Sequence, residues 1–346
     1  MEKIRLGKTE MMVSRLGFGG IPIQRDTEEE AVAVVKKCLE LGITYLDTAN
    51  GYTTSEERIG KAVAGMRENV MIATKSGARD RKTMEEHLAL SLKRLNTDYI
   101  DLYQFHGVGT DEHLDAVLAP DGLLEAAREA QQAGKIRHIG ITSHQVDIAK
   151  KAVQTGNFET IMFPFNFIAR EPAEDLHAVC KELDVGVIAM KPLAGGMLSN
   201  VKIAFKYLFQ YPDVLPIPGI EKVHEIEEIA ALLDGSVELT EADKQEMQKL
   251  QNELGDQFCR RCDYCQPCTE GIRISSVMTS DTIAKRLPPE RLFSGPFAGA
   301  IEEASNCSEC GDCEERCPYH LPIRELIKKR IAAFEEAKRN YEASKA

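Results

Sequence analysis

Short apolar runs and amphipathic stretches alternate along the first 235 residues of the chain. The apolar runs have the length and residue types of buried strands, and the amphipathic stretches repeat apolar positions at helical spacing. This pattern predicts eight strands, over residues 16–19, 43–46, 70–73, 99–105, 136–141, 160–163, 185–189 and 214–217.

Capping signals and helical periodicity predict a helix after most of these strands. Thr27 to Glu30 has the form of a capping box, in which the first and fourth side chains bond each other's backbone N–H groups. Thr83 to Glu86 has the same form, whereas residues 107–120 are predicted to be a loop. Further helices are predicted over residues 121–133, 145–155, 173–184, 201–210, 222–234 and 240–254.

Regular alternation of strands and helices is typical of an α/β fold with a parallel sheet. Eight such units within about 220 residues favour a closed (β/α)8 TIM barrel. An open doubly wound sheet is the alternative, but it usually needs fewer units, and no Gly-x-Gly-x-x-Gly turn follows the first strand. We therefore predict a barrel domain over residues 1–255.

Eight of the ten cysteines lie between Cys259 and Cys317, in a segment without strand-like alternation. Cysteines separated by two residues indicate bound metal when the chain shows no secretion signal. We therefore predict a second, mainly helical domain over residues 256–346, ending in a helix from about Pro322 to Ala343. Cys38 and Cys180 lie in helical patterns and are expected to be buried apolar residues.

The second cysteine group matches the ferredoxin run C-x2-C-x2-C-x3-C-P, which ligates a [4Fe–4S] cluster. Zinc also binds four thiolates, and it is a stronger alternative for the first group, whose last spacing is x2. In two-cluster ferredoxins the fourth cysteine of each group ligates the other cluster. That crossing predicts two ligand sets: Cys259, Cys262, Cys265 and Cys317, and Cys307, Cys310, Cys313 and Cys268.

The formal net charge of −12 argues against nucleic acid and anionic membranes as partners, because both are polyanions. The N-terminal segment lacks the apolar core of a signal peptide, and no apolar run approaches the roughly 20 residues that span a bilayer. We expect a cytoplasmic protein that acts on a small molecule.

Four chemically distinct side chains follow neighbouring strands of the predicted barrel: Asp47, Tyr52, Lys75 and His106. Catalytic groups of (β/α)8 enzymes lie at these carboxyl ends. A tyrosine hydroxyl, whose ordinary pKa is about 10, becomes a better acid beside an ammonium. Tyr52 is therefore predicted to protonate a carbonyl oxygen as a hydride reaches the carbon, supported by Lys75 and Asp47. His106 would orient the substrate.

Each of these residues, taken singly, has an ordinary structural explanation, but the set resembles a known family. Residues 1–255 resemble the aldo-keto reductases in Arg5–Thr9, Arg15–Gly20, Leu46–Ala49 with Tyr52, Ala73–Lys75 and Asp101–His106. The resemblance implies a catalytic tetrad of Asp47, Tyr52, Lys75 and His106. It also implies reversible reduction of an aldehyde or ketone with NADPH or NADH, and an N-terminal hairpin that plugs the barrel.

The resemblance further implies cofactor contacts from several loops. The family's Ser-Asn pair corresponds to Ser143-His144, and its glutamine on the sixth strand aligns with Met162, with Asn166 as the nearby amide. Met190 stands where some members have a stacking tyrosine. The implied contacts are Gly19, Gly20, Asp47, Ser143, His144, Asn166, Met190, Lys191, Leu193, Gly195, Gly219, Lys222, Glu225 and Glu228.

Residues 217–225 correspond to the family's adenosine-binding segment. NADPH-preferring members have basic residues here, whereas this chain has Lys222 between Glu221 and Glu225. A carboxylate repels a phosphate but accepts hydrogen bonds from a ribose diol. These glutamates therefore favour NADH, against the family's preference for NADPH.

Three functions compete for such a chain. The first is an NAD(P)H-dependent carbonyl reductase, and the intact tetrad favours it. The second is an electron-transfer or redox-sensing subunit whose clusters exchange electrons with a redox protein partner. The third is a binding module. A nicotinamide delivers a two-electron hydride whereas each cluster exchanges one electron, so we expect the clusters to lie off the hydride path.

Overall fold

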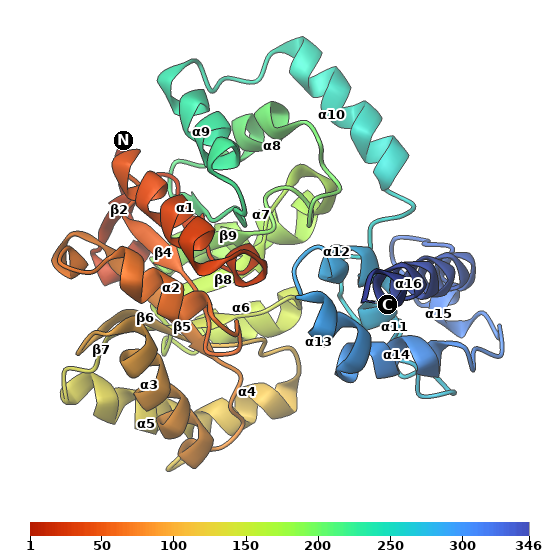
Figure 1. Ribbon diagram of the computed structural model, residues 1–346, viewed down its shortest axis with the longest axis horizontal. Helices are drawn as coiled ribbons and strands as arrows, with labels where there is room; N and C mark the ends of the chain where they lie inside the picture. The colour runs from red at the N-terminus through yellow and green to blue at the C-terminus, as the bar shows by residue number, and fades with distance from the viewer. Residues whose placement is uncertain (346) are drawn as a thin grey trace. The chain divides into compact units, whose positions relative to one another are not determined.

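Eight strands form one parallel sheet in the computed structural model, which describes residues 1–345 (Figure 1). Each strand pairs with the next along the chain. Every strand predicted from the sequence is present. The strands are β3 Phe18–Gly19, β4 Tyr45–Asp47, β5 Met71–Ser76, β6 Ile100–Phe105, β7 Ile136–Thr142, β8 Thr160–Pro164, β9 Gly186–Met190 and β10 Val214–Pro216.

The sheet closes on itself between its first strand and its last. The Gly17 N–H donates to the Pro216 oxygen at 2.9 Å, and the Gly19 N–H donates to the Pro218 oxygen at 2.8 Å. Gly19 also forms a parallel bridge with Gly219. A Cβ on Gly19 would lie 2.7 Å from the Pro218 oxygen, so only glycine allows this approach. The predicted (β/α)8 barrel is confirmed.

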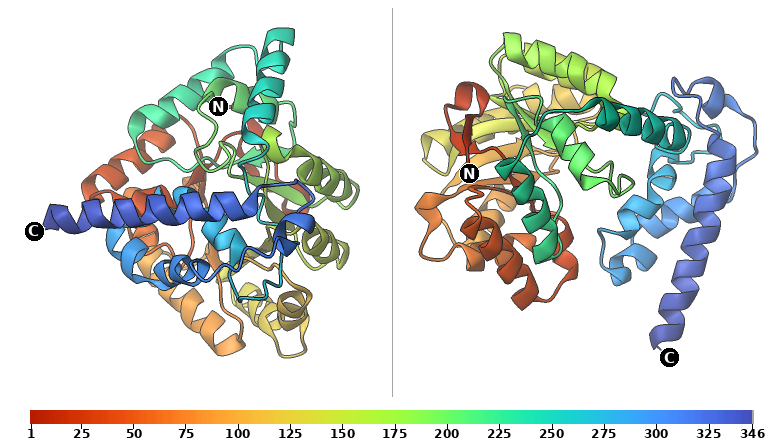
Figure 2. Two further views of the ribbon diagram at one scale, coloured as in Figure 1. Left: turned by 90° about the vertical axis from the view of Figure 1, so that its right-hand side faces the viewer. Right: turned by 90° about the horizontal axis from the view of Figure 1, so that it is seen from above.

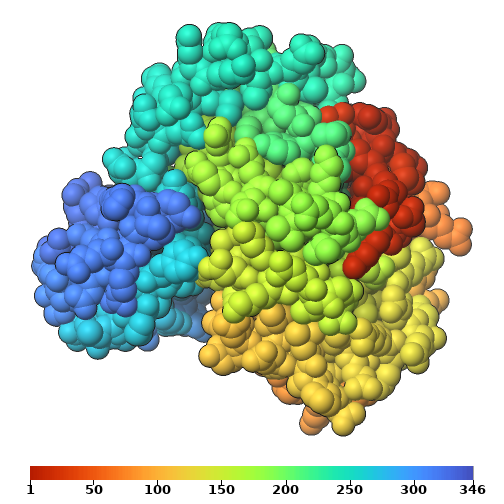
Figure 3. Space-filling model, turned by 180° about the vertical axis from the view of Figure 1, so that it is seen from behind, coloured from red at the N-terminus to blue at the C-terminus, as the bar shows by residue number. Residues whose placement is uncertain are grey.

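Helices follow every strand and cover the barrel. The left view of Figure 2 shows them around the first unit in sequence order, and Figure 3 shows the surface they form from behind. The predicted capping box of α1 is confirmed, since Thr27 and Glu30 bond each other's backbone N–H groups. The helices are α1 Glu28–Glu40, α2 Ser55–Ala62, α3 Arg81–Leu95, α4 Asp111–Leu118, α5 Leu123–Gln132, α6 Val146–Gln154, α7 Arg170–Glu182, α8 Val201–Leu208 and α9 Val223–Ala231.

Two predicted features of these helices are wrong. Helix α3 is capped by Asp80, whose carboxylate accepts the Thr83 N–H at 2.9 Å, so Thr83 lies inside the first turn and forms no capping box. Because Asp80 is the cap, α3 begins three residues earlier than the Thr83–Glu86 pattern indicated. The segment 107–120 contains α4, which buries only Leu114 and Val117 and therefore has a weak apolar pattern. Thr110 caps this helix by accepting the His113 N–H at 3.2 Å.

A short antiparallel hairpin of β1 (Lys3–Arg5) and β2 (Met12–Ser14) precedes the barrel. The Lys8 N–H donates to the Asp184 oxygen just before β9, so the hairpin lies at the amino ends of the strands. Its apolar side chains join inward-facing residues of the barrel strands in one core cluster. The hairpin therefore plugs this end of the barrel, as the resemblance implied. Its members of the cluster are Ile4, Leu6, Met11 and Val13.

The second unit of the chain is helical. Helices α13 and α14 each have a proline in the first turn, Pro289 and Pro296, where the missing N–H costs no hydrogen bond. The last helix, α16, is one straight rod in both views of Figure 2. The helices are α11 Ile274–Met278, α12 Ser280–Ala284, α13 Pro289–Ser294, α14 Pro296–Ala304, α15 Asp312–Glu315 and α16 Ile323–Lys345.

The two units are Met1–Asp243 and Lys244–Ala346. Helix α10, Glu241–Leu254, begins in the first and ends in the second. The predicted domain boundary after residue 255 therefore stays a prediction. Within residues 1–345, no helix combines the length and the apolar character needed to cross a membrane.

Candidate active site

A buried ion pair lies at the carboxyl ends of β4 and β5. Lys75 Nζ donates to Asp47 Oδ1 and to the Thr48 carbonyl oxygen, both at 2.5 Å. The Lys75 and Asp47 side chains are only 1% and 4% exposed. Gln104, on β6, donates from Nε2 to the second Asp47 oxygen at 3.2 Å. The surrounding backbone and side chains thus fix both charged groups in one arrangement.

Burial and pairing act in opposite directions on these two groups. Burial lowers the pKa of the Lys75 ammonium, but Asp47 and Tyr52 raise it more, so that pKa lies above its ordinary value. Burial raises the pKa of the Asp47 carboxyl, and the charge of Lys75 opposes that rise. Lys75 is therefore held as an ammonium ion beside Tyr52 at neutral pH.

Tyr52 and His106 are the members of the set that reach the surface. Lys75 Nζ lies 5.0 Å from the centroid of the Tyr52 ring, and a side-chain hydrogen bond joins the two residues. The His106 ring meets the Tyr52 ring edge to face, with centroids 5.9 Å apart. Both rings are half-buried, whereas the ion pair is enclosed. The structure brings all four predicted residues together and leaves Tyr52 and His106 accessible to a small molecule.

Gln104 was not predicted from the sequence to belong to this site. It is fully buried and lies in β6, two residues before His106, which follows that strand. Side chains two residues apart on a strand share a face, so both are directed toward the same region. A polar residue within a buried apolar strand was the available signal, because such a residue needs a polar partner.

The residues implied as cofactor contacts lie mostly at the same carboxyl end of the barrel. Since all eight strands are parallel, the loops that follow them surround one mouth. Glu228 is exposed on α9. Gly19 ends β3 and Gly20 follows it, Ser143 and His144 follow β7, and Asn166 follows β8. Met190 ends β9, and Lys191, Leu193 and Gly195 lie in the loop after it. Gly219 follows β10, and Lys222 and Glu225 lie at the start of α9.

The loop after β9 has an unusual backbone. Lys191, Ala194, Gly195 and Gly196 all have positive φ, at 55°, 48°, 74° and 91°. Within this loop the Ala194 N–H donates to the Lys191 oxygen at 2.9 Å, and the Gly196 N–H donates to the Leu193 oxygen at 2.8 Å. The loop is therefore a tight turn, closed by its own hydrogen bonds, at the mouth of the barrel.

Two of the implied nicotinamide contacts also have partners within the protein. Asn166 Oδ1 accepts two N–H groups of the short helix Phe167–Ala169 at 3.1 Å, and its Nδ2 donates to the Lys191 oxygen at 3.0 Å. Ser143 Oγ accepts the Gln145 N–H at 3.0 Å. These bonds shape the loops at the barrel mouth. A contact of either side chain with a cofactor stays a prediction.

The eight cysteines of the second unit line two hollows. The fourth cysteine of each sequence group lies with the other group, which is the partition expected from two-cluster ferredoxins. Within residues 1–345, no three His, Cys, Asp or Glu side chains are grouped closely enough to hold a single metal ion. A hollow of about 340 Å³ is lined by Cys259, Cys262, Cys265 and Cys317, and one of about 370 Å³ by Cys268, Cys307, Cys310 and Cys313.

Two family profiles match the chain. The profile described as aldo/keto reductase family matches residues 15–203. The chain belongs to the aldo-keto reductase family. The profile described as 4Fe-4S dicluster domain matches residues 258–322. This aldo-keto reductase therefore carries an iron–sulfur domain after its barrel.

Individual relatives agree with this membership. The uncharacterized oxidoreductase YqkF of Bacillus subtilis is 33% identical over 214 residues, which are 58% of this chain and 67% of the relative. An aldo-keto reductase of Bacillus halodurans in its holo form matches with a TM-score of 0.64 and 30% identity, over 72% of this chain and 96% of its own. One from Klebsiella pneumoniae in complex with NADPH, with a TM-score of 0.61, 22% identity and coverage of 72% and 94%, shares the fold.

Replacing Lys75 by Met should destabilise the protein strongly, because the Asp47 carboxylate stays buried without its cation. Removing one partner of a buried ion pair costs about 3–5 kcal/mol. Adding Asp47→Asn replaces the orphaned carboxylate by a neutral amide and should restore most of the free energy of unfolding. Urea denaturation of both variants, followed by circular dichroism, measures the two effects.

The matched control is Lys61→Met, because Lys61 pairs with Glu28 at the surface, where both side chains are more than half exposed. Such pairs contribute about 0–1 kcal/mol. A double variant no more stable than Lys75→Met would show that the loss does not come from the unpaired charge.

Proposed function

We propose that this chain is an NAD(P)H-dependent oxidoreductase that reversibly reduces an aldehyde or ketone, with Tyr52 as general acid. The observation that carries the proposal is the accessible Tyr52 ring beside the enclosed Lys75 ammonium. Membership of the aldo-keto reductase family supports the reaction class.

Each member of the set has its own task in this proposal. Tyr52 donates its phenolic proton to the carbonyl oxygen, and the Lys75 ammonium stabilises the phenolate that remains. Asp47 keeps Lys75 charged and in place. His106 donates a hydrogen bond to the same oxygen and so orients the carbonyl. In the reverse direction, the Tyr52 phenolate accepts the proton of the alcohol.

A bound reduced nicotinamide would supply the hydride. The loop 191–196, which follows β9 at the mouth of the barrel, is the segment to which we assign its phosphates. In (β/α)8 enzymes, phosphate sites form at the loops after the seventh and eighth strands, which here are β9 and β10. The residues present therefore fit a dinucleotide.

Tyr52→Phe keeps the ring and removes only the proton that the proposal assigns to it. Carbonyl reduction should fall by about 10²–10⁴, the contribution of a positioned general acid, while nicotinamide affinity stays nearly unchanged. Steady-state kinetics over a panel of carbonyl substrates, with NADH and NADPH, measures both.

The control for this change is Tyr99→Phe. Tyr99 precedes β6 at the opposite end of the barrel, where its ring lies against Arg67 and Arg137. That variant should keep wild-type turnover. Near-normal turnover by Tyr52→Phe, on any substrate that the wild type reduces, would remove Tyr52 from the role of acid.

We further propose that each hollow of the second unit holds one [4Fe–4S] cluster. Four cysteines line each hollow, the number that a cluster requires. The match to a 4Fe-4S dicluster domain supports the same assignment.

Paired cysteine substitutions test the crossed arrangement. If Cys262 and Cys317 ligate the same cluster, replacing both by Ala removes only that cluster, and about four of eight irons remain. If Cys262 and Cys268 ligate different clusters, replacing both removes nearly all iron. We expect these results from iron, sulfide and zinc analysis after anaerobic purification.

If each sequence group instead ligated its own cluster, the variant without Cys262 and Cys317 would lose nearly all iron. The variant without Cys262 and Cys268 would then keep about four irons. Each double variant is therefore the control for the other. One zinc ion with about four irons in the wild type would mean that one hollow holds zinc instead of a cluster.

A second function, electron exchange with a redox protein, is favoured by the exposure of Cys310. This residue is exposed, whereas Cys265 and Cys317 of the other hollow are buried. A cluster bound at Cys310 would lie at the surface, where a one-electron partner can approach. Hydride transfer moves two electrons together, so it needs neither cluster.

Chemical reduction of the clusters separates these two roles. With dithionite removed and no partner present, we expect the reduced protein to leave NAD(P)⁺ unreduced, because each cluster transfers one electron at a time whereas NAD(P)⁺ accepts a hydride. An added one-electron acceptor protein should reoxidise the clusters. Anaerobic absorbance spectroscopy follows both. Formation of NAD(P)H without a partner would mean that the clusters feed the nicotinamide directly.

A further inference from the structure

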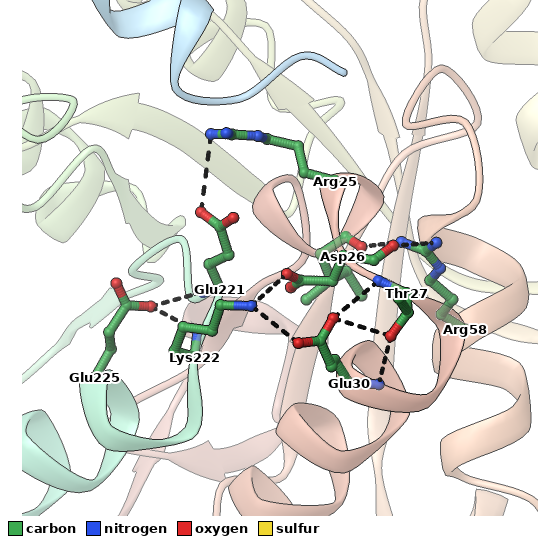
Figure 4. Close-up of polar contacts among 9 residues, drawn as sticks. Arg25, Asp26, Thr27, Glu30, Arg58, Glu221, Lys222 and Glu225 are labelled. Atoms are coloured by element: carbon green, nitrogen blue, oxygen red, sulfur yellow. Dashed lines mark hydrogen bonds and ion pairs between the residues drawn. The ribbon is translucent and has the colours of Figure 1, made fainter. Parts of the chain in front are cut away.

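Charged side chains from two distant parts of the sequence meet beside the seam of the barrel (Figure 4). Lys222, before α9, donates from Nζ to Asp26 Oδ1 at 2.8 Å and to Glu30 Oε1 at 3.4 Å. Asp26 and Glu30 belong to the segment after β3, and Asp26 lies 196 positions from Lys222. The bond to Asp26 raises the pKa of Lys222, so the ammonium is both charged and engaged.

The other donors of this region also have carboxylate partners. The N-terminus of α9 is a place where an anion would ordinarily bind. Here Glu225 Oε2 accepts the N–H groups of Glu221 and Lys222, at 2.7 and 2.9 Å. Arg25 lies 3.9 Å from the Glu221 carboxylate. An arriving phosphate would therefore meet backbone amides, a lysine and an arginine that already face the protein's own carboxylates.

Asp26 is the most constrained member of this cluster. Its side chain is 3% exposed, and Arg58 donates to its backbone oxygen at 2.7 Å. Asp26 Oδ2 has no hydrogen-bond partner among residues 1–345. A buried carboxylate oxygen without a donor is costly, and a hydroxyl group would satisfy it.

We propose that Asp26 and Glu30 lock Lys222 and thereby select NADH over NADPH. This inference rests on the proposed nicotinamide-dependent function, and it assigns cofactor choice to two residues after β3. The adenosine ribose of NADH offers hydroxyl donors to carboxylates. The 2′-phosphate of NADPH would bring negative charge to a cluster of four carboxylates and three cations, Lys222, Arg25 and Arg58. To bind it, Lys222 must leave Asp26 unpaired in a buried position.

The double variant Asp26→Asn/Glu30→Gln removes both carboxylate charges and keeps the side-chain sizes. Binding of NADH and NADPH to the full-length protein is followed by the fluorescence of the nucleotide. We expect the wild type to bind NADH at least as tightly as NADPH. The double variant should bind NADPH about tenfold more tightly than the wild type does, a gain of about 1.4 kcal/mol, and it should bind NADH more weakly, because the ribose hydroxyls lose their carboxylate acceptors.

Lys222→Gln shows whether the lock acts through Lys222. In the wild type this change should alter NADPH affinity little, because Lys222 is already paired. In the double variant it should abolish the gain, and this non-additivity is the signature of coupling. Glu40→Gln, at a side chain 70% exposed near the far end of α1, is the matched control and should leave the NADH to NADPH ratio unchanged.

A single variant covers the case in which the buried change at Asp26 impairs folding. Glu30 is 54% exposed, so Glu30→Gln should fold normally and shift the ratio in the same direction by a smaller factor. A wild-type preference for NADPH of tenfold or more that disappears in Lys222→Gln would overturn the lock. Failure of both nucleotides to bind would instead contradict the proposed function.

Discussion

Closure of the barrel at the seam between β3 and β10 is the constraint on which the catalytic set and the charged cluster both depend. Strand order alone makes each strand a neighbour of the next, but only closure joins Gly19 to Gly219. The parallel, closed arrangement gathers the carboxyl ends of all strands around one mouth. The same seam brings the segment of Asp26 beside Lys222. Glycine at position 19 is required because any Cβ there would collide with the opposing backbone.

The free-energy gain from burying apolar side chains explains the core of the barrel, but it does not explain the buried Asp47–Lys75 pair. Burying two charges costs several kcal/mol per ion, and their attraction only offsets that cost when the remaining polar atoms are also bonded. The Thr48 carbonyl and the Gln104 amide supply those bonds. An apolar pair of similar volume would be about as stable, so stability alone does not account for this pair. In the proposed function, the pair serves to place a charged ammonium beside Tyr52.

The sequence predicted those features whose signal is local. Each strand contains a short apolar run, and Thr27 and Glu30 cap a helix within four residues, so both patterns can be read directly. Asp80 was missed as the helix cap because Thr83, three residues later, is also a residue type that caps helices. Helix α4 was missed because it buries only two residues, whereas the equally short α8 buries six.

The residues of the candidate site also divide into those with a local signal in the sequence and those without one. Asp47, Lys75 and His106 end or follow adjacent strands, so strand order is enough to place them together. To predict Gln104 as part of the site, one would have to know that β6 is buried on both faces. The contact between Asp26 and Lys222 has no local signal, because it depends on closure across 196 positions. A cofactor preference argued from residues 217–225 alone therefore included neither of the carboxylates that pair with Lys222.

Crossed ligation, as proposed for the second unit, would make folding and cluster binding depend on each other. Each hollow takes three cysteines from one sequence group and one from the other, so each cluster would tie residues 259–268 to residues 307–317. The apolar residues between the groups, such as Ile274, Val277 and Ile301, form the core that packs against these cysteines. Ligand binding energy in small metal domains is also folding energy. Loss of either cluster would therefore loosen the same core, whichever of the two clusters exchanges electrons.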